Sequence, residues 1–383
     1  MQVGVIKERR AGELRVAITP ETVKKFVGMG LSVVIETKAG LTAAITDKSY
    51  QEAGANIVKT PDEALKNADI VLKVRKPLSS EGSGKNTEDE VKIMKAGAVL
   101  ICLMEPYSSQ ELIKNLADRN ITTFSMELIP RITRAQTMDT LSSQSNLAGY
   151  KAVLEAAHVF GRAFPMMMTA AGTVPPAKCL VMGAGVAGLQ AIATARRLGA
   201  VVSASDVRPA AKENVESLGA SFVAVEDEEF QQAETAGGYA KVMSDEYKQK
   251  QAELMASTVA KQDIVICTAL IPGRPAPVLV SAEMVKTMRP GSVLVDLAAE
   301  QGGNCPLSVP DKTIIKNGVS IIGQTNLASA VAIDASILFA KNLLSFASLM
   351  INQEDNQLVI DIADEIIKES LLTKNGEVIQ IFT

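Results

Sequence analysis

The feature that most constrains the fold of this chain is a glycine-rich turn between an apolar strand and a helix. Residues 179–182 read CLVM, the run GAGVAG follows at once, and an apolar helical pattern continues to Leu198. In such a unit the first glycine permits a tight turn, the second lets backbone N–H groups approach a pyrophosphate, and the third lets helix and strand pack closely. The helix N-terminus then faces the anion. The pattern predicts a dinucleotide site at Gly183, Gly185 and Gly188, although purely structural glycine turns also join strands to helices.

An acidic residue marks the end of the next predicted strand. Asp206 follows Gly188 at nearly the spacing of about 20 residues expected for the carboxylate that binds an adenosine ribose. A carboxylate there accepts both ribose hydroxyls and repels a 2′-phosphate, which favours NAD(H) over NADP(H). Arg208 could instead receive that phosphate or stack on the adenine, so NADP(H) stays an alternative.

Length and composition indicate a globular protein of two domains. The 383 residues exceed what one hydrophobic core usually serves, and 47% are hydrophobic against 21% charged. The net charge of -4 provides no basic field for nucleic acid or an anionic membrane, so neither is an expected partner. The start MQVGVIKERR has no signal-peptide core, and we expect a cytoplasmic chain without direct membrane insertion. Four scattered cysteines and one histidine predict no metal site.

The rhythm of apolar runs predicts an α/β fold of two doubly wound domains with parallel sheets. Residues 1–140 alternate β-branched strands with helices, and a helical pattern over 141–164, closed by Pro165, predicts a connecting helix. A second such series fills 165–327, with an insertion at about 226–245. Residues from about 328 to 383 are expected to complete the first domain, with Asn375-Gly376 as a hairpin turn.

Several longer motifs occur in a fixed order along the chain. They are MELIPRITRAQ from residue 126 with Asp139, SSQSNLAGY, TAAGTVPPAK, ETAGGYAKVMSDEY, TALIPGRPAPVL and VDLAAEQGGNCP. On these motifs the chain resembles the NAD(H)-binding component (alpha subunit, domain I) of proton-translocating NAD(P) transhydrogenase. The likeness runs from IKERRAGELRVAITPE to about Leu344.

The resemblance implies a homodimer of two-domain subunits with NAD(H) in the cleft between the domains. Hydride would pass directly to NADP(H) on a separate partner component docked on a membrane proton channel. The activity would be that of a Re/Si-specific, proton-translocating NAD(P)+ transhydrogenase, of which this chain is one subunit. The chain would then be peripheral to the inner membrane through its partner subunits.

The resemblance also implies site residues. Arg131, Gln136 and Asp139 would be catalytic, and their donors and acceptors suit a carboxamide and a ribose. Residues of the first domain that would bind cofactor are Arg131, Ile132, Thr133, Gln136, Asp139 and Ser142. Those of the second are Val186, Asp206, Val207, Arg208, Gly238, Tyr239, Gln251 and Leu270, of which Gly238 and Tyr239 would close over the nucleotide as part of a mobile loop. The alternative for residues 131–142 is a polar connector between domains. The alternative for the segment around Gly238 and Tyr239 is a plain surface loop.

The chain also resembles alanine dehydrogenase, which is the main alternative function. Lys7-Glu8 with Arg15, and residues 71–74 around Lys73, match places where that family holds a substrate carboxylate. An interdomain or surface ion pair is the alternative for Lys73 and Arg15. Amine oxidation needs a group that manages protons, and that family places a histidine where this chain has Leu103 and Met104.

Two further positions bear on this choice. His158 lies on the predicted connecting helix, and Glu300 occupies the position that resembles a catalytic aspartate of the rival family. Hydride transfer between two nicotinamide rings needs no proton donor or acceptor, only two rings held in contact. The sequence therefore favours a transhydrogenase subunit, with a non-catalytic NADH sensor as a second alternative.

Overall fold

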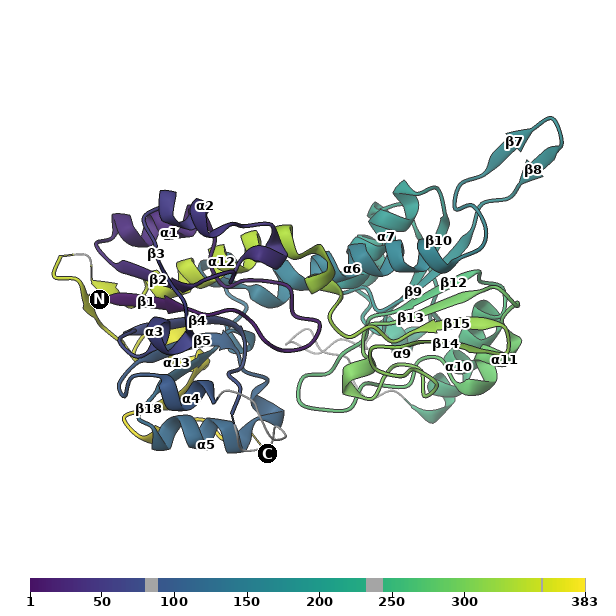
Figure 1. Cartoon of the computed structure of the whole chain (residues 1–383). Coiled ribbons are helices and arrows are strands. Elements are labelled where there is room, and N and C mark those ends of the chain that lie inside the picture. The colour runs from purple at the N-terminus through teal and green to yellow at the C-terminus, as the bar shows by residue number, and fades with distance from the viewer. Residues whose placement is uncertain (80–88, 232–243, 353, 383) are drawn as a thin grey trace. The chain divides into compact units, whose positions relative to one another are not determined.

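The computed structural model describes residues 1–79, 89–231, 244–352 and 354–382, which form two compact units (Figure 1). Unit 1 consists of Met1–Gln144 and Ser329–Thr383, and unit 2 consists of Ser145–Ala328. Each unit contains one large sheet with helices, which confirms the predicted α/β class.

The sheet of unit 1 has eight strands in the order β19-β18-β6-β5-β4-β1-β2-β3. All neighbours from β6 to β3 pair in parallel, whereas β18 and β19 add an antiparallel edge. The strands are β1 (Gln2–Val5), β2 (Ser32–Glu36), β3 (Asn56–Val58), β4 (Ile70–Arg75), β5 (Val99–Leu103), β6 (Thr122–Ser125), β18 (Leu371–Lys374) and β19 (Glu377–Val378). The helices are α1 (Pro20–Gly28), α2 (Asp47–Glu52), α3 (Pro61–Leu65), α4 (Glu90–Ile93), α5 (Gln110–Asp118), α12 (Ala332–Ser348) and α13 (Glu365–Ser370).

The sheet of unit 2 has seven strands in the order β11-β10-β9-β12-β13-β15-β14, and all but β14 are parallel. The strands are β9 (Lys178–Met182), β10 (Val201–Ser205), β11 (Ser221–Phe222), β12 (Ile264–Cys267), β13 (Val293–Asp296), β14 (Thr313–Lys316) and β15 (Val319–Ile322). The helices are α7 (Val186–Arg197), α8 (Ala211–Ser217), α9 (Glu228–Gln231), α10 (Asp245–Val259) and α11 (Ala282–Thr287). Read from β11 to β15, this is the 3-2-1-4-5-6 order of dinucleotide-binding folds.

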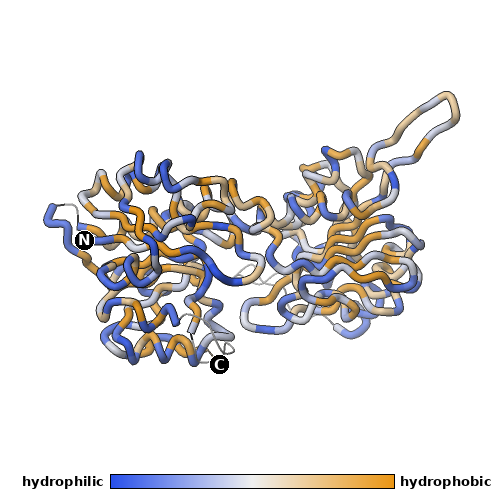
Figure 2. The backbone as a smooth tube through the Cα atoms, in the orientation of Figure 1, coloured by the Kyte–Doolittle hydropathy of each residue, from blue (hydrophilic) through white to orange (hydrophobic). Residues whose placement is uncertain are grey.

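Both sheets are covered on both faces, as parallel sheets require. Successive strand residues point to opposite faces, and in β9 Val181 joins one hydrophobic core while Leu180 joins another. In β4 the same alternation places Leu72 and Val71 in separate cores. The strands therefore lie as hydrophobic segments through the middle of each unit (Figure 2).

The connecting helix is shorter than predicted. Helix α6 spans Thr140–Val159 rather than 141–164. Phe160 and Phe164 are nevertheless buried in the unit 2 core, where their rings meet edge to face at 6.0 Å. Their apolar character reflects packing of an irregular segment rather than a continued helix. The predicted hairpin at Asn375-Gly376 is confirmed as the turn between β18 and β19.

A second hairpin was not predicted. Strands β7 (Met167–Thr169) and β8 (Gly172–Val174) pair with each other and extend away from the body of unit 2 (Figure 1). Its first strand exposes hydrophobic surface, and Met168 is 79% exposed. A further small two-stranded sheet joins β16 (Ile351–Asn352) and β17 (Gln357–Leu358) in unit 1.

One helical stretch, Leu327–Ser348, is long and apolar enough by composition to cross a membrane. Packing explains its composition, because 61% of its apolar 18-residue window is buried inside the protein. Phe339, Leu343 and Phe346 belong to the core of unit 1. A helix that is apolar around most of its surface is typical of a buried core position as well as of a membrane span.

Candidate functional site

The glycine turn, Gly183–Gly188, runs from the end of β9 into the first residues of α7, which begins at Val186, earlier than the glycine run suggested. Gly183 has a φ of +102°, a conformation that favours glycine. A Cβ at Gly188 would lie 1.8 Å from the Gly183 carbonyl oxygen, so only glycine fits there. A Cβ at Gly185 would meet nothing within 4 Å. Gly183 and Gly188 are thus required by the turn itself, while Gly185 leaves open space beside the backbone.

Helix α7 presents an uncapped N-terminus at this open position. Its N-cap is Gly185, which has no side chain to accept from the first N–H groups of the helix. Unpaired N–H groups and the positive end of the helix dipole favour an anion. The arrangement suits a pyrophosphate, the group expected from the sequence.

Asp206 follows β10, the neighbour of β9, and its carboxylate is enclosed by protein donors. The Ala184 backbone N–H donates to Oδ2 at 2.7 Å, which ties Asp206 to the glycine turn. The Arg208 guanidinium donates to both carboxylate oxygens, at 2.9 and 3.0 Å. Burial raises the pKa of Asp206, but these donors outweigh it and hold the pKa below its usual value.

Arg208, which the sequence offers as an alternative ligand for a 2′-phosphate or the adenine, thus pairs with the acidic residue predicted for the ribose. In the described structure Arg208 is a partner of Asp206, and its backbone N–H also donates to Oδ1 at 2.9 Å. The carboxylate remains ionised, so it opposes a 2′-phosphate.

Three predicted apolar residues lie at the carboxyl edge of β9, β10 and β12. Val186 follows β9, Val207 follows β10 and Leu270 follows β12, and their exposed fractions are 41%, 61% and 48%. Ligands of open α/β sheets bind at this edge. Gln251 of α10 reaches the same region, because its side chain accepts from the Val225 N–H at 2.9 Å and contacts the Ser205 hydroxyl at 3.5 Å.

The predicted first-domain residues lie on a short 3-10 helix, η4 (Thr133–Met138), and beside it in unit 1. Ala135 and Met138 are buried in the core, and Asn342 of α12 donates to the Thr137 carbonyl at 2.7 Å. These contacts hold the 3-10 helix against the core of unit 1. The side chains of Arg131, Thr133 and Gln136 are exposed, whereas Ile132 is partly buried.

Asp139 and Ser142 pair with each other at the start of α6. The Ser142 N–H donates to Asp139 Oδ1 at 2.8 Å, and the Ser142 hydroxyl donates to Oδ2 at 2.5 Å. A carboxylate in this position caps the first turn of a helix. Both residues therefore have a structural role in addition to the ligand contacts predicted for them.

Two predicted residues, Gly238 and Tyr239, lie outside the described residues. Among the residues that the structure describes, no group of three or more His, Cys, Asp or Glu could hold a metal ion. All four cysteines are buried and unpaired. His158 is exposed in the last turn of α6.

Lys73 and Arg15, the two cations that could hold a substrate carboxylate, are buried within unit 1 and engaged in ion pairs. Lys73 Nζ lies 3.3 Å from Glu8 and 3.1 Å from Glu90, and we call these three residues the Lys73 cluster. Arg15 donates to both oxygens of Glu13 at 2.7 Å. These are buried pairs, not the surface or interdomain pairs considered from the sequence.

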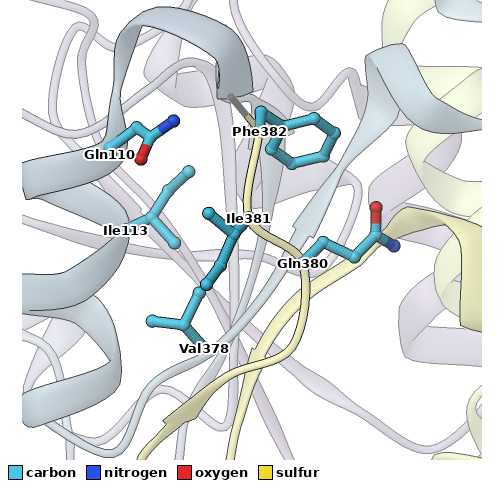
Figure 3. A pocket seen from close by; sticks show the side chains of 6 residues that line it. All are labelled: Gln110, Ile113, Val378, Gln380, Ile381 and Phe382. Carbon is cyan, nitrogen blue, oxygen red and sulfur yellow. The ribbon is translucent and has the colours of Figure 1, made fainter.

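The described pocket in Figure 3 is separate from the predicted site. It lies in unit 1 between α5 and the segment after β19, and it is lined by Gln110, Ile113, Val378, Gln380, Ile381 and Phe382. No predicted cofactor residue contributes to it.

Sequence reasoning missed two polar residues that brace the turn. Thr268, directly after β12, donates its hydroxyl to the Gly183 carbonyl at 3.0 Å. Asn304 is fully buried and hydrogen-bonds both polar backbone groups of Ala269. Both lie in motifs that carried the family resemblance, but their contacts join segments distant in sequence and leave no local pattern.

The fold and the glycine turn define a class, that of two-unit α/β proteins with a dinucleotide-binding Rossmann unit. Family models narrow this class. The alanine dehydrogenase/PNT N-terminal domain matches residues 4–148, and the C-terminal domain of the same family matches 152–381. The chain therefore belongs to the alanine dehydrogenase/PNT family.

Individual relatives lie on both branches of the family. The chain is 55% identical to the first portion of NAD(P) transhydrogenase subunit alpha from Rhodospirillum rubrum, over 99% of this chain and 98% of that protein. A solved transhydrogenase from Sinorhizobium meliloti superposes with a TM-score of 0.88 at 52% identity, covering 99% of this chain and 100% of that one. An alanine dehydrogenase of Methanococcus maripaludis is 33% identical over 99% of this chain and 94% of that protein. The larger identity supports a transhydrogenase component with an oxidoreductase-type role.

Proposed function

We propose that this chain is the NAD(H)-binding subunit of a proton-translocating transhydrogenase. It binds NAD(H) and exchanges hydride directly with NADP(H) held by a partner component, with Re/Si specificity. A membrane component of the complex couples the transfer to proton translocation. The single observation that carries the cofactor side is the glycine turn joined to the ionised Asp206 through the Ala184 N–H.

The residues of unit 2 divide the binding work. The N-terminus of α7 binds the pyrophosphate beside Gly185. Asp206 binds the adenosine ribose after the Arg208 guanidinium has moved away from its carboxylate. Val186, Val207 and Leu270 cover the apolar parts of the ligand, whose binding would remove their exposed surface from water. Gln251 supports the end of β10, and Gly238 and Tyr239 are proposed to close over the nucleotide.

The residues of unit 1 are proposed to orient the reacting end. Bound NAD(H) supplies the hydride chemistry. Arg131 and Gln136 offer exposed donors to the carboxamide and ribose, with Ile132 and Thr133 beside them. Asp139 and Ser142 hold the start of α6 and accept or donate at the same edge. Orientation is the main demand on the protein, because direct ring-to-ring transfer requires contact rather than proton transfer.

The proposal also specifies partners. We propose a homodimer held at the inner membrane by its partner subunits. The exposed methionines of the β7–β8 hairpin support a protein contact on this arm, since exposed hydrophobic surface is favoured at interfaces. Sedimentation of the isolated chain tests the dimer, and a monomer at micromolar concentration would contradict it.

The rival amino-acid dehydrogenase is disfavoured by the surroundings of its expected site residues. Lys73 and Arg15 are neutralised by carboxylates of the chain itself, and Leu103 and Met104 occupy the end of β5 where the rival needs a histidine. A non-catalytic NADH sensor would use the same binding residues without hydride transfer.

Reconstitution separates these functions. The chain is mixed with a matching NADP(H)-binding component, and reduction of an NAD analogue by NADPH is followed by absorbance. We expect transfer that requires both components and no turnover of alanine or pyruvate by this chain alone. Binding of NADH without any transfer would favour the sensor, and robust alanine oxidation would favour the dehydrogenase.

A further inference from the structure

The segment after β12 contains Leu270 but no regular secondary structure. Residues 269–280 lack helix and strand, and Leu270 and Ile271 are 48% and 43% exposed. An irregular segment with exposed apolar side chains needs other contacts to hold one conformation, because fixing each backbone residue costs about 1–2 kcal/mol. Most of the hydrogen bonds that hold this segment come from one buried residue, Asn304, and the Ala276 N–H donates a further one to the Gln301 carbonyl at 2.8 Å.

Asn304 forms hydrogen bonds with both ends of the segment 269–280. Its amide oxygen accepts from the Ala269 N–H at 3.2 Å, and its amide nitrogen donates to the Ala269 carbonyl at 2.9 Å. The same nitrogen donates to the Pro277 carbonyl at 2.8 Å, and the Asn304 backbone carbonyl accepts from Leu279 at 2.8 Å. Asn304 is 0% exposed. One side chain thus satisfies both polar groups of the residue before Leu270.

Asp296, at the end of β13, fixes Asn304 in turn. Its carboxylate accepts from the backbone N–H groups of Asn304 and Cys305, at 3.1 and 3.0 Å, and from the Ser308 hydroxyl at 2.6 Å. Gly303 has a φ of +81°, and a Cβ there would lie 2.9 Å from this carboxylate. The turn that carries Asn304 is therefore built around a buried acid.

The pinned segment also supports the glycine turn. Thr268 donates its backbone N–H to the Met182 carbonyl at 2.9 Å and its hydroxyl to the Gly183 carbonyl at 3.0 Å. A Cβ at Gly183 would lie 2.6 Å from that hydroxyl oxygen. Asn304, Ala269, Thr268 and Gly183 thus form a continuous path of contacts from β13 to the proposed pyrophosphate position.

We propose that Asn304 is a positioning residue for the cofactor, which it affects by holding Leu270 and, through Thr268, the glycine turn. The inference rests on the proposed function only in that the ligand is NADH. To the residues proposed to bind NADH it adds a buried polar residue that acts without contacting the ligand.

The test compares hydroxyl and amide variants of the full chain. Asn304→Leu and Thr268→Val each remove the side-chain hydrogen bonds while keeping the branched shape of the side chain, and Thr268→Ser restores the hydroxyl. Thr258→Val is the matched control, because it removes a hydroxyl bond to Leu254, at 2.8 Å, within α10. NADH affinity and stoichiometry are measured by calorimetry, and hydrogen exchange of residues 269–280 is followed by mass spectrometry.

We expect Asn304→Leu to speed exchange of residues 269–280 and to weaken NADH binding about tenfold, with one site per chain retained, since buried groups left unpaired cost about 1–3 kcal/mol. Thr268→Val should weaken NADH binding as well, while Thr268→Ser and Thr258→Val stay near the unaltered chain. Faster exchange with unchanged NADH affinity would overturn the positioning role. If Asn304→Leu does not fold, unchanged affinity in Thr268→Val overturns it. Failure of the unaltered chain to bind NADH would instead refute the proposed function.

Discussion

The parallel strands of the two units share one order, and the units differ at the point where that order reverses. In unit 2 the reversal lies between β9 and β12, and the glycine turn leaves space there. In unit 1 it lies between β1 and β4, where Glu8 follows β1 and Lys73 belongs to β4. This is the place where open α/β sheets form a ligand crevice. Topology thus offers the crevice twice, and side chains decide whether it is open or filled.

The filled crevice of unit 1 contains more acid than base. Glu8 also accepts from the Val74 N–H at 2.7 Å, so its carboxylate is held from two sides. Burial, only partly opposed by Lys73, raises the pKa of Glu8. For Lys73, burial lowers the pKa, but Glu8 and Glu90 outweigh it and the net direction is upward. The Lys73 cluster is therefore an ion pair network that keeps its lysine charged.

The largest expected effect comes from removing the positive charge from the filled crevice of unit 1. Lys73→Met removes the only cation of the Lys73 cluster and leaves two buried carboxylates facing each other. Breaking a buried pair in this way costs about 3–5 kcal/mol, so we expect a loss of that size in the free energy of unfolding of unit 1. Urea denaturation measures it, with the exposed Lys25→Met as control. A loss below about 1 kcal/mol would show that the cluster does not fill a structural role.

A smaller effect is expected from closing the open crevice. Gly188→Ala forces a Cβ against the Gly183 carbonyl, and overpacking of this kind costs about 1–3 kcal/mol. Gly185→Ala is the matched variant, because its Cβ meets no protein atom within 4 Å. We expect Gly188→Ala to lower the melting temperature and Gly185→Ala to keep it while weakening NADH binding. Equal NADH affinity in Gly185→Ala and the unaltered chain would contradict an open ligand position.

The cofactor preference of the open crevice is tested at Asp206. We expect Asp206→Ala to weaken NADH binding about tenfold or more and NADPH binding far less, because hydrogen bonds to a charged group contribute about 1.5–3 kcal/mol. Calorimetry with both nucleotides measures the difference. Asp206→Asn is the control that keeps an acceptor for the Ala184 N–H without the charge. Parallel losses for NADH and NADPH would refute the assignment.

The smallest effect is a pH dependence of unit 1. Because the folded-state pKa of Glu8 is raised, the folded state favours the protonated acid, and stability falls as the pH rises from about 4.5 through the folded-state pKa. Glu127 contributes with the same sign, since its burial also raises its pKa. We expect Glu8→Gln to flatten part of this decline in urea titrations at several pH values. An unchanged slope would mean that Glu8 stays ionised throughout.

Much of the fold of the two units could be predicted from the sequence, because it depends on local patterns, whereas the buried Lys73 cluster could not. The alternation of apolar residues predicted both sheets, and the glycine turn with Asp206 was identified from spacing alone. The end of α6 was predicted wrongly, because Phe160 and Phe164 continue the apolar pattern of the helix without continuing the helix. The β7–β8 hairpin has exposed apolar residues, which give no amphipathic signal.

The side-chain pairings could not be predicted. Arg208 and Asp206 are neighbours in sequence, but a guanidinium near a carboxylate can bind either it or a ligand. Asn304 and Ala269 are 35 positions apart and meet only when β12 and β13 pair. Such contacts depend on tertiary structure, and the sequence offers an asparagine after two glycines as the only local sign.

The discontinuity of unit 1 has a consequence for biosynthesis. Residues 1–144 are synthesised without α12, although Phe339, Leu343 and Phe346 of that helix belong to their core. Residues 145–328 form unit 2 without help from any later segment. On the ribosome the second unit can therefore complete its core first, and the earlier-made strands of the first must wait until α12 has been synthesised.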